Sequence, residues 1–480
     1  MNQVMSDIRH LGKRYGMEMQ FLEVRSSVDG ALLGKVPALS KEEVDKRMHK
    51  AKHAFSKWSH TTLSERLNIL YKTAELLEQN REELAELLLR EVGKSKKSAE
   101  SEVIRTAALI RHTADTAKTI YKNPRNGDNL GGYKKGKFAM SHRIPLGLVL
   151  AISPFHYPVN LAASQIAPAL AMGNTVVLKP ASVGCLSGLY LVKMFQKAGV
   201  PEDVLQTVTG KGNEVGDYAV THPLVDFIHF VGSTYVGQKI AEKVSVVPTL
   251  MELGGKSTTI IFEDADLDVA AKHIVGEAFS YSGQHCSAVK CVLVMEFVHD
   301  KLISKIAEYM KLLVVGNPLE VNADVVPLIS EKSADFVWNM IQDSLGKGGK
   351  LITGGKREGN LIQPTLIDQV TADMNLVCLE VFGPVLPIIT VHSEEEAVSI
   401  TNRWKNGFQA SLFTRDINRA FLIAEELDVG VVQINGKTER GPEHLPFIGM
   451  KSSGVAVGEM RYSLKAMSRM KSTIVNLTIV

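Results

Sequence analysis

The sequence contains few cysteines, almost no net charge and no long apolar run. Only four of its 480 residues are cysteines, and no two of them form a Cys-x-x-Cys pair. This excludes a disulfide framework and argues against structural zinc, so no metal site is expected. The net charge is +3, too small to indicate binding to nucleic acid or to a membrane surface. Because no run of about 18 uncharged apolar residues is present, we expect no membrane-spanning segment.

Residues 1–16 also lack the apolar core of a secretory signal, because charged side chains interrupt their apolar ones. These absences together predict a cytoplasmic protein. The composition itself is that of an ordinary globular protein, with 45% apolar and 22% charged residues. A chain of 480 residues is long enough for about three domains.

Two helix-start motifs occur near the N-terminus. The segments 40–43 (Ser-x-x-Glu) and 62–65 (Thr-x-x-Glu) are capping boxes, whose side chains satisfy free backbone amides at the start of a helix. Leucines then recur at helical spacing over 63–88, which predicts one buried helical face. Gly93 is a suitable stop for that helix.

From about Pro145 the pattern changes to short apolar strands that alternate with helices. This alternation predicts a parallel, doubly wound sheet. The predicted strands cover 148–152, 175–178, 204–208 and 227–231, and the predicted helices cover 162–172 and 187–198. A second alternating stretch, from about 258 to 435, predicts a second α/β domain. The β-rich tail 471–480 would be an exposed edge strand if left alone, so we expect it to pair with another subunit.

Two glycine-rich segments are candidates for a phosphate-binding turn. The segment 210–216 (Gly-x-Gly-x-x-x-Gly) lacks the spacing of the common dinucleotide motif, which favours a simple loop between a strand and a helix. In the segment 232–237 (Gly-Ser-Thr-x-x-Gly) a strand runs directly into a helix, whose free N-terminal amides and positive dipole end suit a phosphate. A plain strand-to-helix cap would look the same, so both interpretations stay open.

Three single residues are candidates for chemistry. Glu252 lies in an apolar frame, where a carboxyl group tends to have a raised pKa and can act as a general base; a surface glutamate at a turn is an equal alternative. Cys286 follows a glycine turn, but most free cysteines are buried and inert. The adjacent His285 does not support a Cys-His pair, because neighbouring side chains usually point apart. Lys179 ends a predicted strand at the carboxyl edge of the sheet, where open α/β folds bind ligands.

Six segments, taken in this order, resemble the aldehyde dehydrogenase superfamily over about residues 20–475. They are Pro154-Phe155-His156-Tyr157-Pro158, Leu178-Lys179-Pro180, Gly232-Ser233-Thr234, Glu252-Leu253-Gly254-Gly255-Lys256, Gly283-Gln284-His285-Cys286 and Glu380-x-Phe382-Gly383-Pro384. The segments 158–161, 279–284 and 435–441 are further similar to the branch of NADP-dependent, non-phosphorylating glyceraldehyde-3-phosphate dehydrogenases. The combination favours functional roles for Cys286 and Glu252.

The resemblance implies an α/β fold with a doubly wound parallel-sheet cofactor domain, an α/β catalytic domain and a small β flap. Subunits of such proteins assemble through the flap, so a homodimer or homotetramer is expected. The implied ranges are 1–120 with 144–253 for the dinucleotide-binding domain, 254–447 for the catalytic domain, and 121–143 with 463–480 for the flap.

The resemblance also implies a cysteine thioester mechanism. The Cys286 thiolate attacks the aldehyde, while its own backbone amide and the side chain of His156 hold the oxyanion. Hydride passes to the nicotinamide, and Glu252 activates the water that hydrolyses the thioester. Cofactor contacts are implied for Ser153, Lys179, Ser182, Asp217, Gly232, Ser233, Glu380 and Phe382. Substrate contacts are implied for Arg105, Tyr157, His285, Ser287, Arg440 and Gly441.

Three positions bear on cofactor and substrate choice. Ser182 permits the 2′-phosphate of NADP, where NAD-preferring relatives often carry a glutamate, so NADP is favoured and NAD is the alternative. His156 replaces the family's asparagine, and His285 replaces an arginine of the phosphate-binding branch; a neutral histidine can donate one hydrogen bond. The expected activity is oxidation of glyceraldehyde 3-phosphate to 3-phosphoglycerate. The alternatives are oxidation of another small aldehyde, such as lactaldehyde or a semialdehyde, and an attenuated family member.

Overall fold

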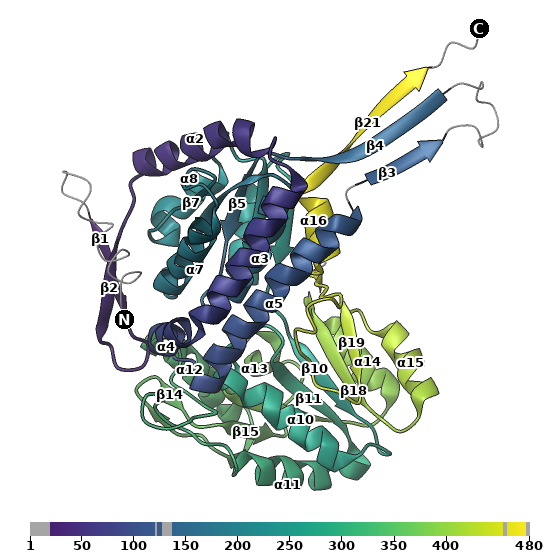
Figure 1. The fold of residues 1–480 in the computed structure, drawn as a ribbon. Coiled ribbons are helices and arrows are strands. Elements are labelled where there is room, and N and C mark those ends of the chain that lie inside the picture. The colour runs from purple at the N-terminus through teal and green to yellow at the C-terminus, as the bar shows by residue number, and fades with distance from the viewer. Residues whose placement is uncertain (1–19, 121, 127–136, 455–457, 477–480) are drawn as a thin grey trace.

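The computed structural model describes residues 20–120, 122–126, 137–454 and 458–476. It contains two α/β lobes, each built around one large sheet, and a three-stranded sheet that projects from the upper lobe of Figure 1. No helix within the described ranges is both long and apolar enough to cross a membrane.

The N-terminal part of the chain forms a small hairpin and then helices. Strands β1 (Phe21–Arg25) and β2 (Leu32–Pro37) pair with each other at the side of the molecule. Helices α2 (Lys41–Trp58) and α3 (Leu63–Gln79) follow. Both helices begin at a complete capping box, which confirms the two predicted helix starts.

The helical face predicted to continue to Gly93 is broken at Asn80. A second helix, α4 (Arg81–Val92), begins there, so the prediction of one helix is wrong. The Asn80 side chain donates a hydrogen bond to the Leu76 carbonyl at 2.7 Å, a local bond that competes with helical continuation. Gly93 does end α4, in the left-handed conformation with φ 70°.

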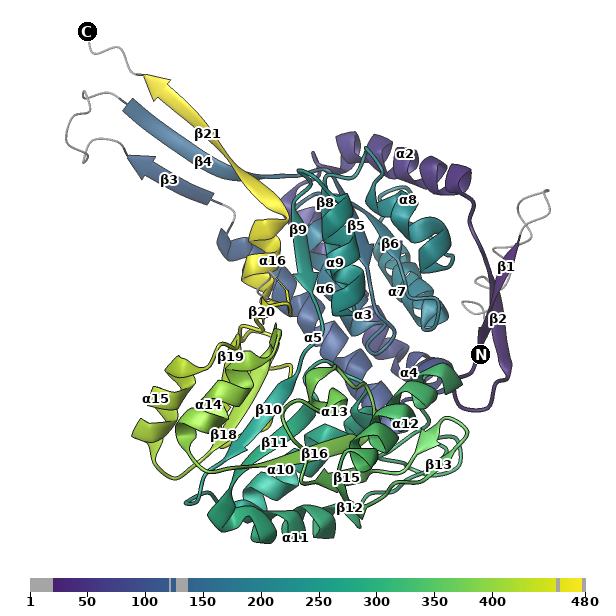
Figure 2. The same ribbon diagram turned by 180° about the vertical axis from the view of Figure 1, so that it is seen from behind.

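The upper lobe contains a parallel sheet of order β7-β6-β5-β8-β9 (Figure 2). Its strands are β5 (Leu148–Ile152), β6 (Thr175–Lys179), β7 (Leu205–Thr207), β8 (Phe227–Val231) and β9 (Thr249–Glu252). Its principal helices are α5 (Lys96–Ile120), α6 (Asn160–Ala171), α7 (Cys185–Ala198), α8 (Asp217–Val220) and α9 (Thr234–Lys243). The predicted strands and helices are therefore present, with only their ends shifted.

The side chains of β5 explain why this sheet is covered on both faces. Val149 and Ala151 belong to the apolar cluster formed with α3, α5, α6 and α7. Leu148 and Leu150 point the other way, into a cluster with residues of α2 and α9. Because successive residues of a strand face opposite sides, a strand buried on both faces is continuously apolar. The doubly wound sheet is confirmed.

The lower lobe contains a sheet of order β12-β15-β16-β11-β10-β18-β19, in which only β12 runs antiparallel to its neighbour. Its strands are β10 (Ser257–Ile261), β11 (Val289–Met295), β12 (Lys350–Thr353), β15 (Thr365–Asp368), β16 (Val385–Val391), β18 (Gln409–Phe413) and β19 (Val431–Ile434). Its helices include α10 (Leu267–Phe279), α11 (His299–Met310), α12 (Glu331–Gly346), α14 (Glu394–Arg403) and α15 (Ile417–Glu426). The second α/β unit is confirmed.

The projecting sheet has the order β21-β4-β3. Its strands are β3 (Lys122–Asn126), β4 (Lys137–Pro145) and β21 (Ser468–Asn476). The described part of the predicted C-terminal strand, which lies within β21, thus pairs with β4 of the same chain, and the other edge of β21 is the outer edge of this sheet. Residues 127–136 and 477–480 of the predicted flap lie outside the described residues. Pairing of this edge with another subunit, and the domain boundaries given above, stay predictions.

Candidate active site

Two cavities meet at Cys286. The α5 cavity, of about 430 Å³, is lined by α5, by the end of α10 and by the segment 437–440. The β8–β9 cavity, of about 390 Å³, is lined by the residues that follow β8 and β9 and by Glu380 and Phe382. His156 and Cys286 line both cavities. A group on Cys286 is therefore accessible from two sides, which is what a reaction between two separately bound molecules requires.

A strained turn presents Cys286 between the cavities. Tyr281 and Ser282 have φ values of 48° and 56°, in the left-handed region that non-glycine residues rarely adopt. The Ser282 hydroxyl donates to the Val326 carbonyl at 2.6 Å and accepts from the Val326 amide at 2.8 Å, which holds the turn in place. A Cβ at Gly283 would lie 2.5 Å from the Gly383 carbonyl oxygen. The glycine turn seen in the sequence is therefore a packing requirement.

The Cys286 thiol is protonated in this arrangement. Burial raises its pKa to about 12, while the positive charge of Arg440 acts in the opposite direction. A thiolate is the nucleophilic form, so the reaction requires a neighbouring base to accept the thiol proton.

His156 lies between β5 and α6 as a neutral imidazole. Burial, with the positive charges of Lys94 and Arg440, lowers its pKa to about 3. The ring packs against Tyr157 and Phe382, each with a centroid separation of 5.7 Å. Its Nε2 is buried and has no hydrogen-bond partner among the described residues. The residue itself lines both cavities.

Glu252 ends β9 and is held by an ion pair. Arg440 Nη1 donates to Glu252 Oε2 at 2.7 Å, and His229 Nε2 lies 3.9 Å from Oε1. The sequence suggested a carboxyl group in an apolar frame, and the ion pair with Arg440 corrects that expectation. Glu252 lines the β8–β9 cavity together with Cys286.

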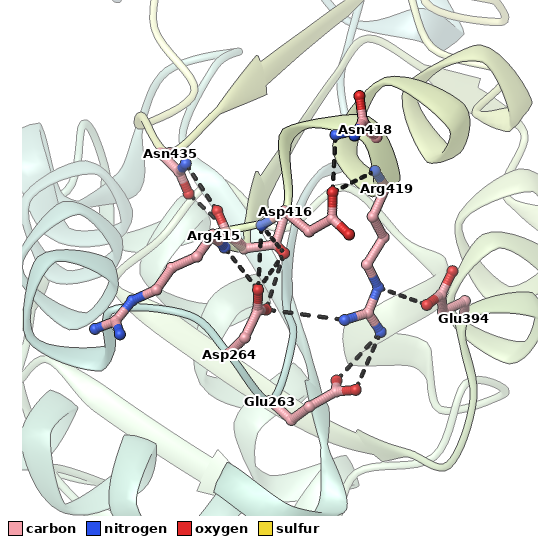
Figure 3. A network of polar contacts seen from close by, with 9 residues as sticks. Glu263, Asp264, Glu394, Arg415, Asp416, Asn418, Arg419 and Asn435 are labelled. Atoms are coloured by element: carbon pink, nitrogen blue, oxygen red, sulfur yellow. Dashed lines mark hydrogen bonds and ion pairs between the residues drawn. The ribbon is translucent and has the colours of Figure 1, made fainter.

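The start of the segment that leads from β19 to Arg440 is held by the polar network of Figure 3, through Asn435. Asn435 follows β19 with φ 54°, and its side chain accepts from the Thr414 amide at 3.1 Å and donates to the Thr414 carbonyl at 2.9 Å. Asp264 accepts from the amides of Arg415 and Asp416 at 2.8 and 3.2 Å, which ties the end of β10 to the loop after β18. The carboxyl ends of β10, β18 and β19 are thereby joined just before the chain enters the α5 cavity.

The predicted substrate residues Arg105, Arg440 and Gly441 lie together. Arg105 Nη2 donates to the Arg440 carbonyl, and Arg105 also pairs with Glu443 at 2.6 Å. A Cβ at Gly441 would lie 3.2 Å from Arg105 Nη2, so the glycine permits this close approach. Tyr157, His285 and Ser287 line the same cavity as Arg105 and Arg440. All six predicted substrate residues therefore belong to one region.

A buried ion pair lies beneath Tyr157. Lys94 Nζ is 3.5 Å from the centroid of the Tyr157 ring and 2.6 Å from Glu102 Oε2. Glu102 Oε1 accepts from the amides of Val159 and Asn160, at 2.9 and 3.0 Å, at the start of α6. Sequence reasoning missed this pair, because Lys94 opens a run of lysines and serines that resembles an exposed surface segment.

The predicted cofactor residues fall into two groups. Gly232, Ser233, Glu380 and Phe382 line the β8–β9 cavity, whereas Ser153, Lys179, Ser182 and Asp217 are not among its lining residues. The Ser233 side chain caps α9 by accepting from the Val236 amide at 3.4 Å. The Glu380 carboxylate accepts from the Gly255 amide at 3.1 Å.

Members of the second group lie around the carboxyl end of β6. Lys179 is the last residue of β6, and its carbonyl accepts from the Ser153 amide at 3.2 Å. Ser182 donates to the Gly210 carbonyl at 3.3 Å, and Asp217 pairs with Lys243. The Lys179 ammonium group is buried and has no carboxylate partner among the described residues, and burial lowers its pKa. A buried cation without a carboxylate partner fits an anionic dinucleotide.

A separate His-Asp cluster lies away from both cavities. Ligand-type atoms of Asp45, His49 and His222 lie within 4.8 Å of one another. His222 Nε2 pairs with Asp45 Oδ1 at 3.1 Å, and His222 Nδ1 accepts from the Leu224 amide at 3.3 Å. Because both ring nitrogens of His222 already have internal partners, the cluster is a structural contact between α2 and the end of α8.

Comparison with known proteins agrees with this geometry. The model of the aldehyde dehydrogenase family matches residues 16–473. The chain belongs to the aldehyde dehydrogenase family. The resemblance seen in the six sequence segments is thereby confirmed.

Individual members are similar over nearly their whole length. The chain is 46% identical over 468 residues to an NADP-dependent glyceraldehyde-3-phosphate dehydrogenase of Streptococcus equinus, covering 98% of each chain. It is 37% identical to a lactaldehyde dehydrogenase of Methanococcus aeolicus, covering 95% of this chain and 97% of that one. A crystal structure of the NADP-dependent glyceraldehyde-3-phosphate dehydrogenase from Bacillus halodurans, complexed with NADP, has a TM-score of 0.94, 48% identity and 96% coverage of both chains.

Proposed function

We propose that the protein is an NADP-dependent dehydrogenase that oxidises glyceraldehyde 3-phosphate to 3-phosphoglycerate without phosphorylation. The observation that carries this proposal is the position of Cys286 and His156 at the junction of the two cavities. The similarity to relatives named NADP-dependent glyceraldehyde-3-phosphate dehydrogenase supports the proposal. The α5 cavity then receives the aldehyde, and the β8–β9 cavity receives the nicotinamide.

Each chemical step of the proposed reaction is assigned to residues of this chain. Glu252 accepts the thiol proton of Cys286, and the sulfur attacks the aldehyde carbon. The carbonyl oxygen becomes an oxyanion that accepts hydrogen bonds from the Cys286 amide and the neutral His156 imidazole. NADP, when bound, would supply the hydride acceptor that conversion of the adduct to a thioester requires. After Glu252 has passed its first proton to solvent, it takes a proton from water, and the resulting hydroxide attacks the thioester. The tetrahedral adduct collapses to the acid and the Cys286 thiolate, which regains a proton from Glu252.

Binding of NADP is assigned to residues that end or follow strands of the upper sheet and to Glu380 of the lower lobe. Lys179 and Ser182 would hold the adenosine 2′-phosphate, because a buried cation without a carboxylate partner gains most from a phosphate. Ser233 would meet the pyrophosphate at the start of α9, and Glu380 would accept from the nicotinamide ribose. NAD, which lacks the 2′-phosphate, is the alternative cofactor.

Binding of the substrate phosphate is assigned to Arg105, Tyr157 and Arg440. Both arginines already pair with carboxylates, Arg105 with Glu443 and Arg440 with Glu252. A phosphate must therefore share or replace these carboxylate partners, which weakens its net binding.

One observation favours a second candidate function, oxidation of a small unphosphorylated aldehyde such as lactaldehyde or a semialdehyde. His285 is buried beside Cys286, and burial holds its pKa well below the usual value for histidine. A neutral imidazole contributes no charge for a phosphate. Similarity to a lactaldehyde dehydrogenase supports the same candidate. An attenuated enzyme is the third outcome.

The test measures reduced nicotinamide at about 340 nm with the purified protein and NADP, in buffer without inorganic phosphate. We expect glyceraldehyde 3-phosphate to give the highest kcat/KM, with 3-phosphoglycerate as product, and Cys286→Ala to give none. A higher kcat/KM for lactaldehyde or succinic semialdehyde would favour the second candidate. Absence of turnover with every aldehyde would indicate an attenuated protein.

Assembly through the projecting sheet is part of the proposal. The outer strand β21 exposes apolar side chains, with Ile474 61% and Met470 46% exposed. Such an edge favours pairing with a second copy, so a homodimer or homotetramer is expected. Sedimentation of the wild type and of Ile474→Lys tests this: the variant should dissociate toward the monomer.

A further inference from the structure

A chain of polar contacts crosses the wall of the α5 cavity beside Cys286. Lys437 Nζ lies 3.2 Å from Glu277 Oε2, and the Ser287 hydroxyl donates to Glu277 Oε1 at 3.3 Å. His285 Nδ1 lies 3.2 Å from the same hydroxyl oxygen. Lys437, Glu277, His285 and Ser287 all line the cavity, and we refer to them as the Glu277 chain.

The Glu277 chain fixes the proton position on His285. A serine hydroxyl has one hydrogen, and here Ser287 donates it to the Glu277 carboxylate. The Ser287 oxygen can then only accept from His285, so the imidazole proton must be on Nδ1. Nε2 of the neutral ring therefore carries a lone pair and is a hydrogen-bond acceptor.

The charge state of Glu277 agrees with its role as the acceptor of the Ser287 hydrogen bond. Burial raises the pKa of Glu277 to about 7, and the ammonium group of Lys437 acts in the opposite direction. The carboxyl group is therefore an acceptor above neutral pH. Burial, followed by the positive charge of Lys290, holds the pKa of His285 well below its usual value, so the ring stays neutral there.

The acceptor on His285 has no partner within the protein. Nε2 is buried and makes no hydrogen bond with any described residue. A buried acceptor left unsatisfied costs free energy, which a ligand that donates a hydrogen bond recovers. His285 and Cys286 both line the α5 cavity, so a ligand group that satisfies Nε2 belongs to the substrate bound in that cavity.

We propose that His285 Nε2 accepts a hydrogen bond from a hydroxyl group next to the aldehyde carbon, so that the site selects 2-hydroxyaldehydes. The inference rests on the proposed attack of Cys286 on an aldehyde, but on neither a phosphate nor a particular chain length. Glyceraldehyde 3-phosphate and lactaldehyde both carry this hydroxyl. Ser287 and Glu277 are positioning residues in this scheme, because they act on the substrate only through the tautomer of His285.

The experiment compares lactaldehyde with propionaldehyde, which differ only in the hydroxyl group. Assays with NADP run at about pH 8.5, where a carboxyl group with a pKa of about 7 is ionised. We expect the wild type to favour lactaldehyde by about 10- to 100-fold in kcat/KM, the discrimination typical of a lost buried hydrogen bond. His285→Phe, which keeps a ring but has no acceptor, should bring this ratio close to one.

Three further variants distinguish the loss of recognition of the substrate hydroxyl group from general damage to the active site. Ser287→Ala should lower the ratio through a higher KM for lactaldehyde, and Ser287→Thr, which keeps the hydroxyl, should restore it. His392→Phe is the matched control, because its imidazole is on the surface, away from the cavity, and pairs with Glu296. A wild-type ratio near one, or a ratio that His285→Phe and Ser287→Ala leave unchanged, would overturn the inference while aldehyde oxidation stands. If the wild type oxidises no aldehyde at all, the proposed function fails first.

Discussion

Replacing His156 tests whether its imidazole stabilises the oxyanion. Two donors are expected to meet this oxygen, the Cys286 amide and the buried His156 ring, whose Nε2 has no partner within the described residues. Loss of one such donor typically lowers turnover by about 10²- to 10³-fold, or about 2.7 to 4 kcal/mol of transition-state stabilisation. We therefore expect His156→Ala to lower kcat by this factor. His156→Asn, which restores an amide donor, should keep or raise it.

The burial of His156 also predicts how the free energy of unfolding depends on pH. The pKa of His156 is about 3 in the folded protein, because of burial first and neighbouring cations second. An ordinary histidine in the unfolded chain has a pKa of about 6.5, so the unfolded state binds more protons between about pH 3 and 6.5. The folded state therefore loses about 1.4 kcal/mol per pH unit as the pH falls through this window. Relative to the wild type, His156→Asn should gain about 2 kcal/mol on going from about pH 8 to pH 5.

Two measurements decide the matter. Steady-state kcat at saturating cofactor, from about pH 6 to 8, should show no step that disappears in His156→Asn, because His156 is neutral across this range. Urea unfolding of both proteins at the two pH values gives the stability difference. A kcat for His156→Ala within about three-fold of the wild type would refute the oxyanion role. A stability difference independent of pH would refute the neutral, buried state of the ring.

Four other variants test the remaining assignments. Cys286→Ser should abolish aldehyde oxidation but keep cofactor binding, since a serine hydroxyl is a far weaker nucleophile than a thiolate; more than a few per cent of turnover would exclude the role. Glu252→Gln should lower steady turnover about 10²- to 10⁴-fold, and a surviving burst of reduced cofactor would place its essential step after hydride transfer. Ser182→Glu should raise KM for NADP at least about ten-fold and leave KM for NAD little changed, because like charges repel; equal effects would contradict the 2′-phosphate site. Glu102→Gln should destabilise the fold by about 3 to 5 kcal/mol in urea unfolding, because it leaves Lys94 buried without its counter-charge.

Elements whose signal is local could be predicted from the sequence. Strand β5 of the upper sheet is a continuous apolar run because both of its faces are buried, and the two capping boxes are complete within four residues each. The break at Asn80 could not be predicted from the leucine spacing, because both helices keep their leucines buried on either side of it. There, the Asn80 side chain donates a hydrogen bond to the preceding turn, which competes with continuation of the helix.

The chemistry of the site depends on contacts between distant residues, and these left no pattern in the sequence. The motif around Glu252 suggested an apolar setting, but its partner Arg440 lies 188 residues further along the chain. Glu277 lies on α10 as one acidic residue among many, and only the fold brings it against Ser287 and Lys437. The residue types could therefore be matched to a mechanism from the sequence alone, whereas the charge states of their side chains could be inferred only from the structure.

The buried pair of Lys94 and Glu102 shows how structural polar groups set up the reactive ones. A buried ion pair is a weak source of stability, because the cost of desolvation offsets most of the Coulomb attraction. This pair has a geometric consequence instead. Glu102 holds the first amides of α6, where an anion also complements the helix dipole, and Lys94 lies against the Tyr157 ring. The α6 end of the short segment between β5 and α6 is thus held in place, and the one residue of that segment that lines both cavities is His156.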